Sequence, residues 1–414
     1  MALLEKLLTG KLDHGRLNII RANGNNVSFG DGDPAWPDVT MRVQSPSAER
    51  KILFDPALGL AETFMSGAVT IDDDDIMGLV EIARRNNAWE NDGQIDAPSI
   101  VQRVIDKATN PVLQLNSLAR SRSNVAHHYD LSNDFYKLWL DDDMQYSCAY
   151  WAPGVKTLEA AQTAKKAHIA AKLLLEPKQR VLDIGCGWGG MALYLNRVAD
   201  VDVLGITLSE EQLKLARERA DAAGVSDRVK FELIDYRDLA ARDAHGFDRI
   251  VSVGMFEHVG VPQFETFFRA CSNLMKDDGV MLMHTIGRMG VPGVTDLFTR
   301  RYIFPGGYIP SLSETLRASE KVKLIASDIE NLRLHYAYTL REWYKRVRAV
   351  REQVIERYDE SFYRMWIFYL AGATSAFESD NMCNHQYQFV RNRRALPITR
   401  DYMAEKEKEY LAKG

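Results

Sequence analysis

The strongest constraint on the fold is a glycine-rich loop between an apolar strand and a helix. Residues 180–184 (Arg-Val-Leu-Asp-Ile) predict the strand, residues 185–190 (Gly-Cys-Gly-Trp-Gly-Gly) form the loop, and residues 191–198 continue as a helical pattern. This succession is typical of a nucleotide site at the edge of a parallel sheet. Glycine is needed there because a ligand that lies across the strand end leaves no room for Cβ atoms.

The spacing of the glycines fits two kinds of cofactor. Gly185, Gly187 and Gly190 satisfy the Gly-x-Gly-x-x-Gly pattern of dinucleotide-binding proteins. The compact Gly-x-Gly-x-Gly-Gly run, which includes Gly189, and the acidic Asp183 inside the strand end are instead typical of S-adenosylmethionine methyltransferases. These two features favour S-adenosylmethionine as the cofactor.

The length of the chain predicts more than one domain. A chain of 414 residues exceeds the size to which one hydrophobic core usually grows. Residues 1–95 predict a small α+β domain of a lipid-binding type, residues 96–122 a helical connector, and residues 123–414 the S-adenosylmethionine-dependent catalytic domain. In the N-terminal domain, the patterns of residues 39–43 and 51–54 predict strands.

The predicted catalytic domain alternates helices with short apolar strands, which indicates a mainly parallel sheet. We therefore predict an α/β fold, a class I methyltransferase-like, doubly wound, mostly parallel sheet, with the smaller α+β domain preceding it in sequence. The predicted strands are residues 180–184, 201–206, 229–234, 248–253 and 280–285.

The ends of the second and third strands offer candidate contacts to a nucleoside. An acid that accepts hydrogen bonds from the ribose is usual after the second strand, but residues 206–209 (Ile-Thr-Leu-Ser) contain none. Gln212 is the substitute, although Ser209 and Gln212 also fit a capping box at the start of a helix, and both interpretations stay open. Asp235 and Tyr236 follow the third strand, where a ligand contact is favoured over a simple turn.

Charge, cysteines and hydropathy narrow the class of protein. The formal net charge is −5 with mixed signs along the chain, so no basic field favours nucleic acid as a partner. The four cysteines lie far apart without metal-ligand spacing, which predicts no metal site and suits a reducing cytoplasm. The sequence begins without a signal-peptide pattern and has no apolar run of about 18 residues, so we expect no transmembrane segment. Any contact with a membrane, expected at its inner face, must then be peripheral.

Six further segments, in this order along the chain, resemble the cyclopropane fatty acyl phospholipid synthase family. The resemblance covers about residues 120–400, and the ordered set is highly specific. The segments are residues 128–136 (His-Tyr-Asp-Leu-Ser-Asn-Asp-Phe-Tyr), 144–151 (Met-Gln-Tyr-Ser-Cys-Ala-Tyr-Trp), 253–260 (Val-Gly-Met-Phe-Glu-His-Val-Gly), 284–287 (His-Thr-Ile-Gly), 302–307 (Tyr-Ile-Phe-Pro-Gly-Gly) and 340–344 (Leu-Arg-Glu-Trp-Tyr).

The resemblance implies which residues bind S-adenosylmethionine and adds weight to Gln212 as the partner of the ribose. Together with the strand residue Asp183, the predicted cofactor-binding residues are Tyr146, Ser147, Gly185, Gly187, Gly189, Thr207, Leu208, Gln212, Asp235, Tyr236 and Arg237.

The resemblance also implies a bound bicarbonate ion that serves as the base. The residues around that ion correspond to Cys148, Glu257, His284, Ile286 and Tyr336. The implied reaction moves the methyl group of S-adenosylmethionine to the cis double bond of an unsaturated phospholipid acyl chain and closes a cyclopropane ring. The sequence leaves open whether bicarbonate or Glu257 takes the proton.

The chain departs from the family at one position and leaves alternative functions open. Some members carry a cysteine proposed as a nucleophile where this chain has Ala373, which excludes covalent cysteine catalysis there. His258 has no family role and is interpreted as structural. The alternatives are a methyl-branched or exomethylene acyl product, an amine methyltransferase, or a lipid-carrier protein. The sequence does not decide whether the chain forms a homodimer.

Overall fold

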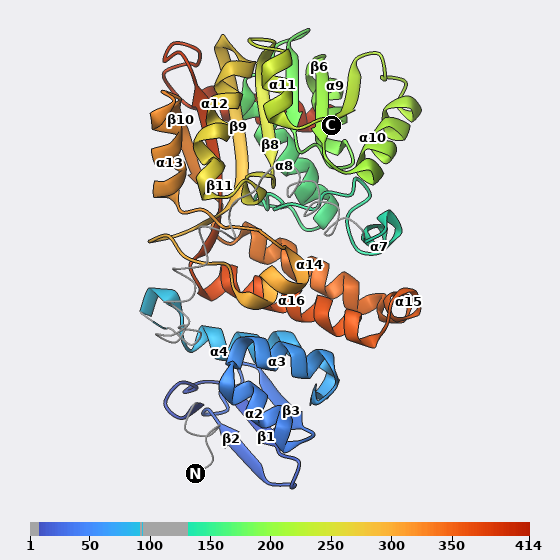
Figure 1. Cartoon of the computed structure of the whole chain (residues 1–414), viewed down its shortest axis with the longest axis vertical. Coiled ribbons are helices and arrows are strands. Elements are labelled where there is room, and N and C mark those ends of the chain that lie inside the picture. Colours follow the sequence, from blue (N-terminus) through green and yellow to red (C-terminus); the bar gives the residue numbers. More distant parts are fainter. Residues whose placement is uncertain (1–7, 92, 94–130) are drawn as a thin grey trace. The chain divides into compact units, whose positions relative to one another are not determined.

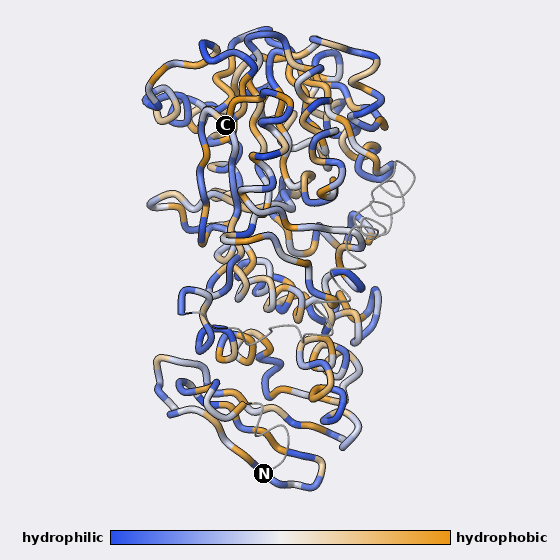
Figure 2. The backbone as a smooth tube through the Cα atoms, turned by 60° about the vertical axis from the view of Figure 1, so that its left-hand side comes forward, coloured by the Kyte–Doolittle hydropathy of each residue, from blue (hydrophilic) through white to orange (hydrophobic). Residues whose placement is uncertain are grey.

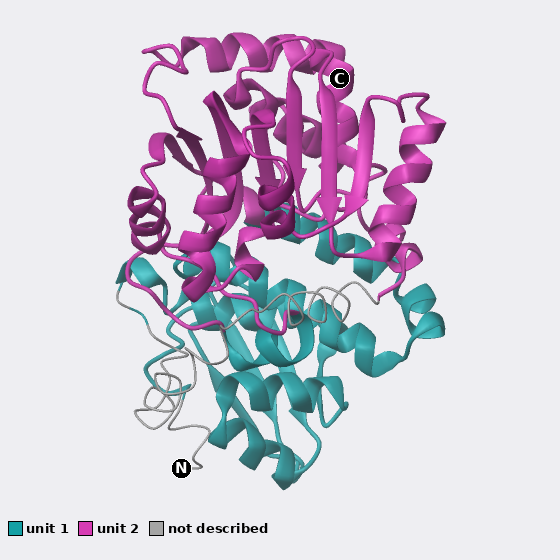
Figure 3. Cartoon of the chain, turned by 45° about the horizontal axis from the view of Figure 1, so that its top comes forward, with its two compact units in different colours: residues 1–106, 296–303, 337–382 teal, residues 107–295, 304–336, 383–414 magenta. Residues whose placement is uncertain are grey.

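The glycine-rich loop belongs to the larger of two compact units in the computed structural model. Unit 1 comprises residues 1–106, 296–303 and 337–382, and unit 2 comprises residues 107–295, 304–336 and 383–414 (Figure 3). The structure describes residues 8–91, 93 and 131–414. The helical connector predicted over residues 96–122 therefore lies outside the described residues.

Unit 2 is built on a seven-stranded sheet with the strand order β10-β11-β9-β8-β5-β6-β7 (Figure 1). The strands from β5 to β9 pair in parallel, and β10 runs antiparallel to β11. The predicted doubly wound, mostly parallel sheet is thus confirmed, and its five predicted strands correspond to β5 through β9. The strands are β5 (Arg180–Ile184), β6 (Asp202–Thr207), β7 (Val229–Leu233), β8 (Phe247–Val253), β9 (Met275–Arg288), β10 (Ile325–Asn331) and β11 (Met382–Val390).

Helices cover both faces of this sheet. Val181 and Val203 pack into the hydrophobic cluster on one face, whereas their neighbours Leu182 and Leu204 pack into the cluster on the other. Because successive side chains of a strand point to opposite faces, strands covered on both sides must be apolar throughout. The first face carries α8 (Leu158–Leu173), α9 (Gly190–Ala199), α10 (Glu210–Ala222) and α17 (Asp401–Lys413), and the second α11 (Tyr236–Arg242), α12 (Phe264–Leu274) and α13 (Leu312–Lys321).

The sequence pattern did not predict β10 and β11. β11 is buried over nearly its whole length and yet carries the amides Asn384, Gln386 and Gln388. These amides have hydrogen-bond partners: Gln386 Oε1 accepts from Lys172 Nζ at 2.8 Å, and Gln388 Nε2 donates to the Tyr402 hydroxyl at 2.8 Å. Burying an amide costs little free energy when the amide is hydrogen-bonded in this way. A strand that carries such amides is not recognised when strands are predicted from apolar residues.

Unit 1 contains a four-stranded sheet of order β2-β1-β3-β4, as expected for an α+β domain. β1 pairs antiparallel with β2 and parallel with β3, and β3 pairs antiparallel with β4. The strands are β1 (Arg16–Ile20), β2 (Asn26–Phe29), β3 (Asp38–Val43) and β4 (Val69–Ile71). The helices are α2 (Pro46–Phe54), α3 (Pro56–Met65), α4 (Ile76–Arg85), most of α14 (His335–Ala349), α15 (Arg351–Arg357) and α16 (Glu360–Ser379).

The strand predicted at residues 51–54 is wrong, because these residues end helix α2. Ser45 caps this helix by accepting a hydrogen bond from the Ala48 amide at 3.2 Å, and Pro46 occupies its first turn. A capping serine followed by proline is a strong signal for the start of a helix. That signal outweighs a short apolar run at the end of the helix.

The compact units differ from the continuous domains predicted from the sequence. Residues 296–303 and 337–382 were predicted to be part of the catalytic domain, which begins at residue 123 in that prediction. In the structure they belong to unit 1. There α16 packs against α3 and α4, and Arg341 of α14 pairs with Glu81 of α4 at 3.1 Å. The partners of these late helices lie 260 to 300 residues earlier in the chain, which a local sequence pattern does not reveal.

Hydrophobic and hydrophilic segments alternate along the chain in both units (Figure 2). Among residues 8–91, 93 and 131–414, no helix combines the length and the apolar character needed to cross a bilayer.

Candidate active site

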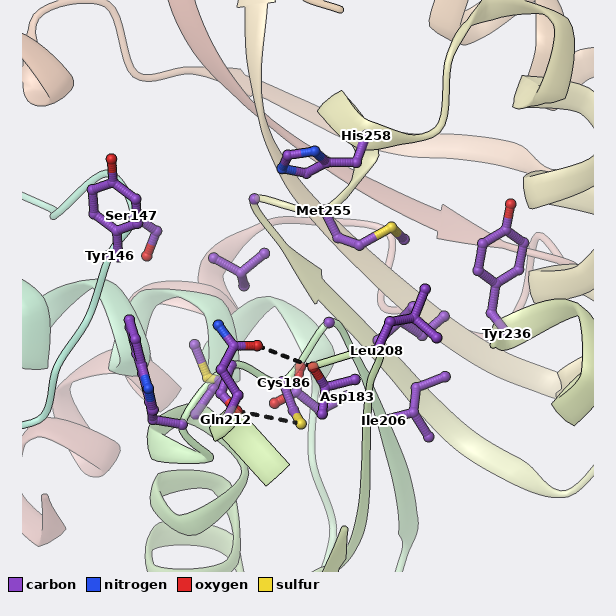
Figure 4. A pocket seen from close by; sticks show the side chains of 18 of the residues that line it. Tyr146, Ser147, Asp183, Cys186, Ile206, Leu208, Gln212, Tyr236, Met255 and His258 are labelled. Atoms are coloured by element: carbon purple, nitrogen blue, oxygen red, sulfur yellow. Dashed lines mark hydrogen bonds between the residues drawn. The ribbon is translucent and has the colours of Figure 1, made fainter. Parts of the chain in front are cut away.

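A pocket lies at the C-terminal ends of the parallel strands of unit 2 (Figure 4). Asp183 of β5 and Thr207 of β6 line it, as do Asp235 after β7 and Gly254 and Met255 after β8. Figure 4 shows that side chains from these separate elements surround one common space. Ligands collect at this edge of a doubly wound sheet because neighbouring strands there connect to opposite faces and leave a crevice.

Most residues predicted to bind the cofactor line this pocket. Of the twelve, eleven do so, and Gly189 is the exception. Gly189 precedes α9 with a φ of 82°, and a Cβ atom added there would lie 2.7 Å from Cζ of Phe231 on β7. Glycine at this position therefore allows the start of α9 to pack closely on β7.

Gly187 combines two reasons for being glycine. Its φ is +54°, a left-handed conformation that side chains with a Cβ rarely adopt. An added Cβ would meet no atom within 4 Å, and the residue lines the pocket. The space in front of Gly187 is therefore pocket space, which a larger side chain would fill.

Asp183 places a buried carboxyl group in the pocket wall. Burial raises the pKa of Asp183 to about 7, although the nearby Lys165 cation opposes this shift. Its Oδ2 atom has no hydrogen-bond partner among the described residues. A cationic ligand in the pocket would stabilise the carboxylate form of Asp183.

The two interpretations of Gln212 are now separated. The Ser209 hydroxyl caps α10 by accepting from the Gln212 amide at 3.3 Å, which is half of the capping box. The other half is not formed by Gln212, because the Ser209 amide donates to the Thr207 hydroxyl at 3.2 Å. The Gln212 side chain instead accepts from that hydroxyl at 3.0 Å and lines the pocket.

Asp235 serves the backbone as well as the pocket. Its Oδ1 accepts from the Arg237 amide and caps α11, and both carboxylate oxygens accept from the Arg237 guanidinium at 2.7 and 2.8 Å. The Arg237 guanidinium also lies 5.2 Å from the ring centre of Tyr236. The predicted contact of Asp235 with the nucleoside would therefore use a side chain that is already held in place.

Lys165 of α8 is a site residue that the sequence analysis did not single out. Its ammonium group is fully buried and donates to Gln145 Oε1 at 2.5 Å and to Ser147 Oγ at 2.8 Å, and both partners line the pocket. Burial lowers the pKa of Lys165 to about 8. The available signal was the spacing of basic residues along an alanine-rich helix, Lys165, His168 and Lys172, which places them on one face.

Of the five residues predicted to surround the bicarbonate ion, Glu257 and Ile286 are hydrogen-bonded to each other. Glu257 lies in a short 3-10 helix (Phe256–His258) after β8, and its Oε1 accepts from the Ile286 amide at 2.7 Å. Its Oε2 atom is buried and accepts no hydrogen bond of suitable geometry from the described residues. The nearby Thr285 hydroxyl, which donates to the Ile286 carbonyl at 3.1 Å, only weakly favours the carboxylate form. Burial raises the pKa of Glu257 to about 7, because the charged form is poorly solvated.

The other three predicted anion residues are buried in unit 2. The His284 ring contacts the side-chain amides of Asn384 and Gln386 on β11. The Cys148 thiol donates to the Ala149 carbonyl at 3.4 Å, and burial raises its pKa above the ordinary value for a thiol. Tyr336 is also buried, with 8% of its surface exposed.

His258 lines the pocket, although its sequence suggested a purely structural role. Burial lowers the pKa of His258 to about 4, so the ring is neutral at physiological pH. It follows Glu257 directly, so one short 3-10 helix supplies both the pocket residue and the buried carboxyl group. Within the described part of the chain, no group of His, Cys, Asp and Glu side chains is arranged to hold a metal ion.

The order of the seven strands and the pocket at their C-terminal edge define the class of protein: the fold is that of a class I S-adenosylmethionine-dependent methyltransferase. The family model described as mycolic acid cyclopropane synthetase matches residues 116–387. Cyclopropane-fatty-acyl-phospholipid synthase of Escherichia coli K12 is 38% identical over 351 residues, which cover 85% of this chain and 87% of that protein. The chain belongs to the mycolic acid cyclopropane synthetase family and is an S-adenosylmethionine-dependent methyltransferase.

Two further comparisons extend this relation. Tuberculostearic acid methyltransferase of Mycobacterium tuberculosis is 31% identical and covers 94% of this chain and 91% of its own. The solved structure of mycolic acid cyclopropane synthase CmaA1 complexed with SAH and CTAB has a TM-score of 0.60 and 32% sequence identity, and it covers 65% of this chain and 97% of that one.

We predict that Gly187→Val lowers the affinity for S-adenosylmethionine by at least about tenfold, because the branched side chain fills pocket space in a strained backbone conformation. Isothermal titration calorimetry measures this affinity. Gly224→Val is the matched control, since Gly224 also has a positive φ and open space but does not line the pocket. Equal affinities in the two variants would contradict the placement of the cofactor.

Proposed function

We propose that the chain transfers the methyl group of S-adenosylmethionine to the cis double bond of an unsaturated phospholipid acyl chain and closes a cyclopropane ring. The observation that carries this proposal is the buried Glu257, a carboxyl group with a pKa of about 7 and one unpaired oxygen. Glu257 lies between Met255 and His258 in the sequence, and both Met255 and His258 line the pocket. The E. coli synthase, which aligns over most of both chains, supports the choice of reaction.

The cofactor-binding residues would be those that line the pocket. Gly187 leaves room for the ligand, the Gln212 amide would contact the ribose, and the Asp183 carboxylate would compensate positive charge. Gly185 also lines the pocket, but a Cβ atom added there would lie 2.9 Å from the Met255 side chain. When bound, S-adenosylmethionine supplies an electrophilic methyl group, and its transfer to an alkene leaves a cation on the acyl chain. The pocket must hold the double bond in line with that methyl group, which is a matter of positioning.

The chain must then accept one proton from the newly added methyl group, since loss of that proton lets the ring close. A base works best when its pKa lies near the working pH. Glu257, with a pKa of about 7, meets this requirement, and its Oε2 atom is the unpaired acceptor. Burial keeps water away from the cation, which would otherwise be trapped as an alcohol.

We further propose that bicarbonate binds beside Glu257 and takes part as the base. The unpaired Glu257 Oε2 atom fits the hydroxyl donor of such an ion, and the Tyr336 hydroxyl is another candidate partner. His284 would lie beside the ion without bonding it, because both of its ring nitrogens are bonded to the amides of Asn384 and Gln386. The Ile286 amide already donates to Glu257 Oε1, so an anion at this place would share that donor. Cys148 completes the set of residues that the ion would contact.

We also propose that the protein acts as a peripheral enzyme on phospholipids at the cytoplasmic face of the membrane, and that residues 1–95 contribute to the lipid contact. This proposal is supported by the phospholipid named in the E. coli relative, which aligns with 85% of this chain. The fold of unit 1 constrains any test, because α16 packs against α3 and α4 and a deletion of residues 1–95 would expose α16.

A second candidate keeps the methyl transfer and changes the product to a methyl-branched or exomethylene acyl chain. The observation in its favour is the alignment over 94% of this chain with a relative named tuberculostearic acid methyltransferase, not cyclopropane synthase. Both candidates use the same pocket and the same cation, and they differ in how the cation is lost.

We predict that Glu257→Gln lowers kcat by at least about tenfold while the affinity for S-adenosylmethionine stays within about twofold, because Glu257 serves the later steps and does not line the cofactor pocket. Glu232→Gln, on β7 and paired with Arg242, is the control for the same chemical change outside the site. A wild-type kcat in Glu257→Gln would refute the assigned role.

The same variant should change how stability depends on pH. The pKa of Glu257 is about 7 in the folded protein and near its ordinary 4.5 when unfolded. The folded state therefore retains a proton that the unfolded state releases, and the free energy of unfolding falls as pH rises through this interval. Urea unfolding of the cofactor-free protein measures this free energy between pH 5 and pH 8. We expect it to fall with pH by roughly 1–3 kcal/mol less in Glu257→Gln than in the wild-type protein.

We predict that thorough removal of bicarbonate slows turnover and that adding it back restores the rate. Methyl transfer is measured in sealed, carbon-dioxide-free buffer, with acetate as the control anion. If the rate does not depend on bicarbonate, the base is Glu257 itself and the proposal for the ion is wrong.

The product decides between the two candidate functions. We expect purified protein, given vesicles of unsaturated phospholipid and S-adenosylmethionine, to yield acyl chains whose proton NMR spectrum shows the strongly shielded signals of a cyclopropane ring and loses the alkene signals. Vinylic signals of an exomethylene group, or a branched methyl doublet, would favour the second candidate. Absence of any methylated acyl chain would contradict both.

A further inference from the structure

A row of buried polar side chains in unit 2 leads to His284. The Lys172 ammonium group of α8 donates to the Glu330 carboxylate of β10 and, at 2.8 Å, to Gln386 Oε1 of β11. The Gln386 amide nitrogen lies 3.1 Å from His284 Nδ1, and the Asn384 amide lies 3.2 Å from His284 Nε2. All of these side chains except Glu330 are buried.

The charges at the outer end of this row are well defined. His168 lies between Glu330 and Glu407, with its two ring nitrogens 2.7 and 2.8 Å from their carboxylates. Burial alone would raise the pKa of Glu330, but the bonds from His168 and Lys172 lower it to about 2. Glu330 is therefore a carboxylate. Burial lowers the pKa of Lys172, but the hydrogen bond to the Glu330 carboxylate opposes this shift and keeps Lys172 as an ammonium ion, which can only donate hydrogen bonds.

The hydrogen-bond donors and acceptors around Gln386 then determine the orientation of its side-chain amide. Because Lys172 only donates, the Gln386 side chain must turn its oxygen toward Lys172 and its NH2 group toward His284. His284 Nδ1 must accept this hydrogen bond and therefore carries no proton. Burial, together with the cations Lys165, Lys172 and His168, lowers the pKa of His284 well below its ordinary value, so the ring is neutral. A neutral imidazole has one N–H group, which leaves it on Nε2.

Asn384 must adapt to this tautomer. The Asn384 amide faces Nε2, and a protonated Nε2 requires an acceptor. A half-turn of the amide about the Cβ–Cγ bond presents its oxygen to the N–H group at the same distance. Gln386 has no such freedom, since the opposite orientation would set its NH2 group against the Lys172 ammonium group.

We propose that Lys172 and Gln386 are positioning residues that hold His284 as the tautomer protonated on Nε2. Both ring nitrogens are then used within the protein, Nδ1 as the acceptor from Gln386 and the Nε2–H group as the donor to Asn384. His284 therefore has no free lone pair and is excluded as the base that takes the proton from the methylated acyl chain. The fixed ring holds the end of β9, where the Ile286 amide donates to Glu257 Oε1. That task stays with Glu257 or with an anion beside it. This inference rests on the proposed function for its role in catalysis, but not for the tautomer itself.

The tautomer can be read directly by NMR. The full-length protein labelled with 15N-histidine has nine histidines, and the His284 signals are those lost in His284→Asn. We expect a protonated Nε2 and an unprotonated Nδ1 in the wild-type protein at pH 7 to 8. A proton on Nδ1 in this spectrum would overturn the proposal.

Gln386→Glu is the decisive variant because it is nearly isosteric and carries only acceptors toward both neighbours. Its carboxylate should still accept from Lys172 and should draw the proton of His284 to Nδ1, which reverses the tautomer. Gln179→Glu makes the same chemical change outside this row and should leave the tautomer unchanged, because Gln179 Oε1 accepts from the Glu176 amide at 3.0 Å and a carboxylate keeps that bond. Lys172→Met, which frees the Gln386 amide to turn, should give both tautomers and serves if Gln386→Glu does not fold.

Measurements of kcat test whether the tautomer of His284 matters for the reaction. We expect Gln386→Glu to lower kcat by at least about tenfold, with the KM for S-adenosylmethionine within about twofold, while Gln179→Glu stays near the wild-type kcat. A switched tautomer with an unchanged kcat would overturn the positioning role while leaving the proposed function intact. If the wild-type protein itself methylates no acyl chain, the proposed function fails, and the NMR result still decides the tautomer.

Discussion

The whole site depends on one constraint, which is that the parallel sheet of unit 2 is covered by helices on both faces. Water is thereby excluded from the sheet, and ligands have access only at the edge where the parallel strands end. Carboxyl groups placed at that edge are poorly solvated, and this is why Asp183 and Glu257 both have a pKa of about 7. The sheet thus supplies both the location of the pocket and the acid–base properties of its side chains.

Helix α8 places two cations in the interior of unit 2, and one of them, Lys165, opposes the raised pKa of Asp183. Its alanines, including Ala164, Ala167 and Ala171, let the helix lie close to the sheet, and Lys165 and Lys172 extend from it into the interior. Lys165 binds the segment that borders the pocket, whereas Lys172 binds the amides of β11. A buried cation is tolerable only when it is hydrogen-bonded and near opposite charge, and the long side chains of α8 satisfy both conditions.

Sequence patterns predicted those parts of the fold whose formation depends on residues close together in the chain. The apolar runs of β5 to β9 and the glycine-rich loop were visible because fully covered strands are apolar and tight loops need glycine. The run of residues 51–54 misled the prediction because its periodicity was considered without the cap at Ser45. β11 was missed because Asn384, Gln386 and Gln388 are buried through side-chain partners that lie far away in sequence.

By itself, the sequence determined the fold class, the edge of the sheet where the cofactor pocket lies, and eleven of the residues that line it. The fold class and the edge of the sheet follow from the order of strands, glycines and helices. Several of the eleven residues, such as Tyr146 and Ser147, were instead implied by the family resemblance. The tertiary structure decided that Gln212 turns into the pocket, that Gly189 serves packing, and that residues 337–382 join unit 1. It also decided the partners of His284, because hydrogen bonds between buried side chains depend on which distant strands and helices come together.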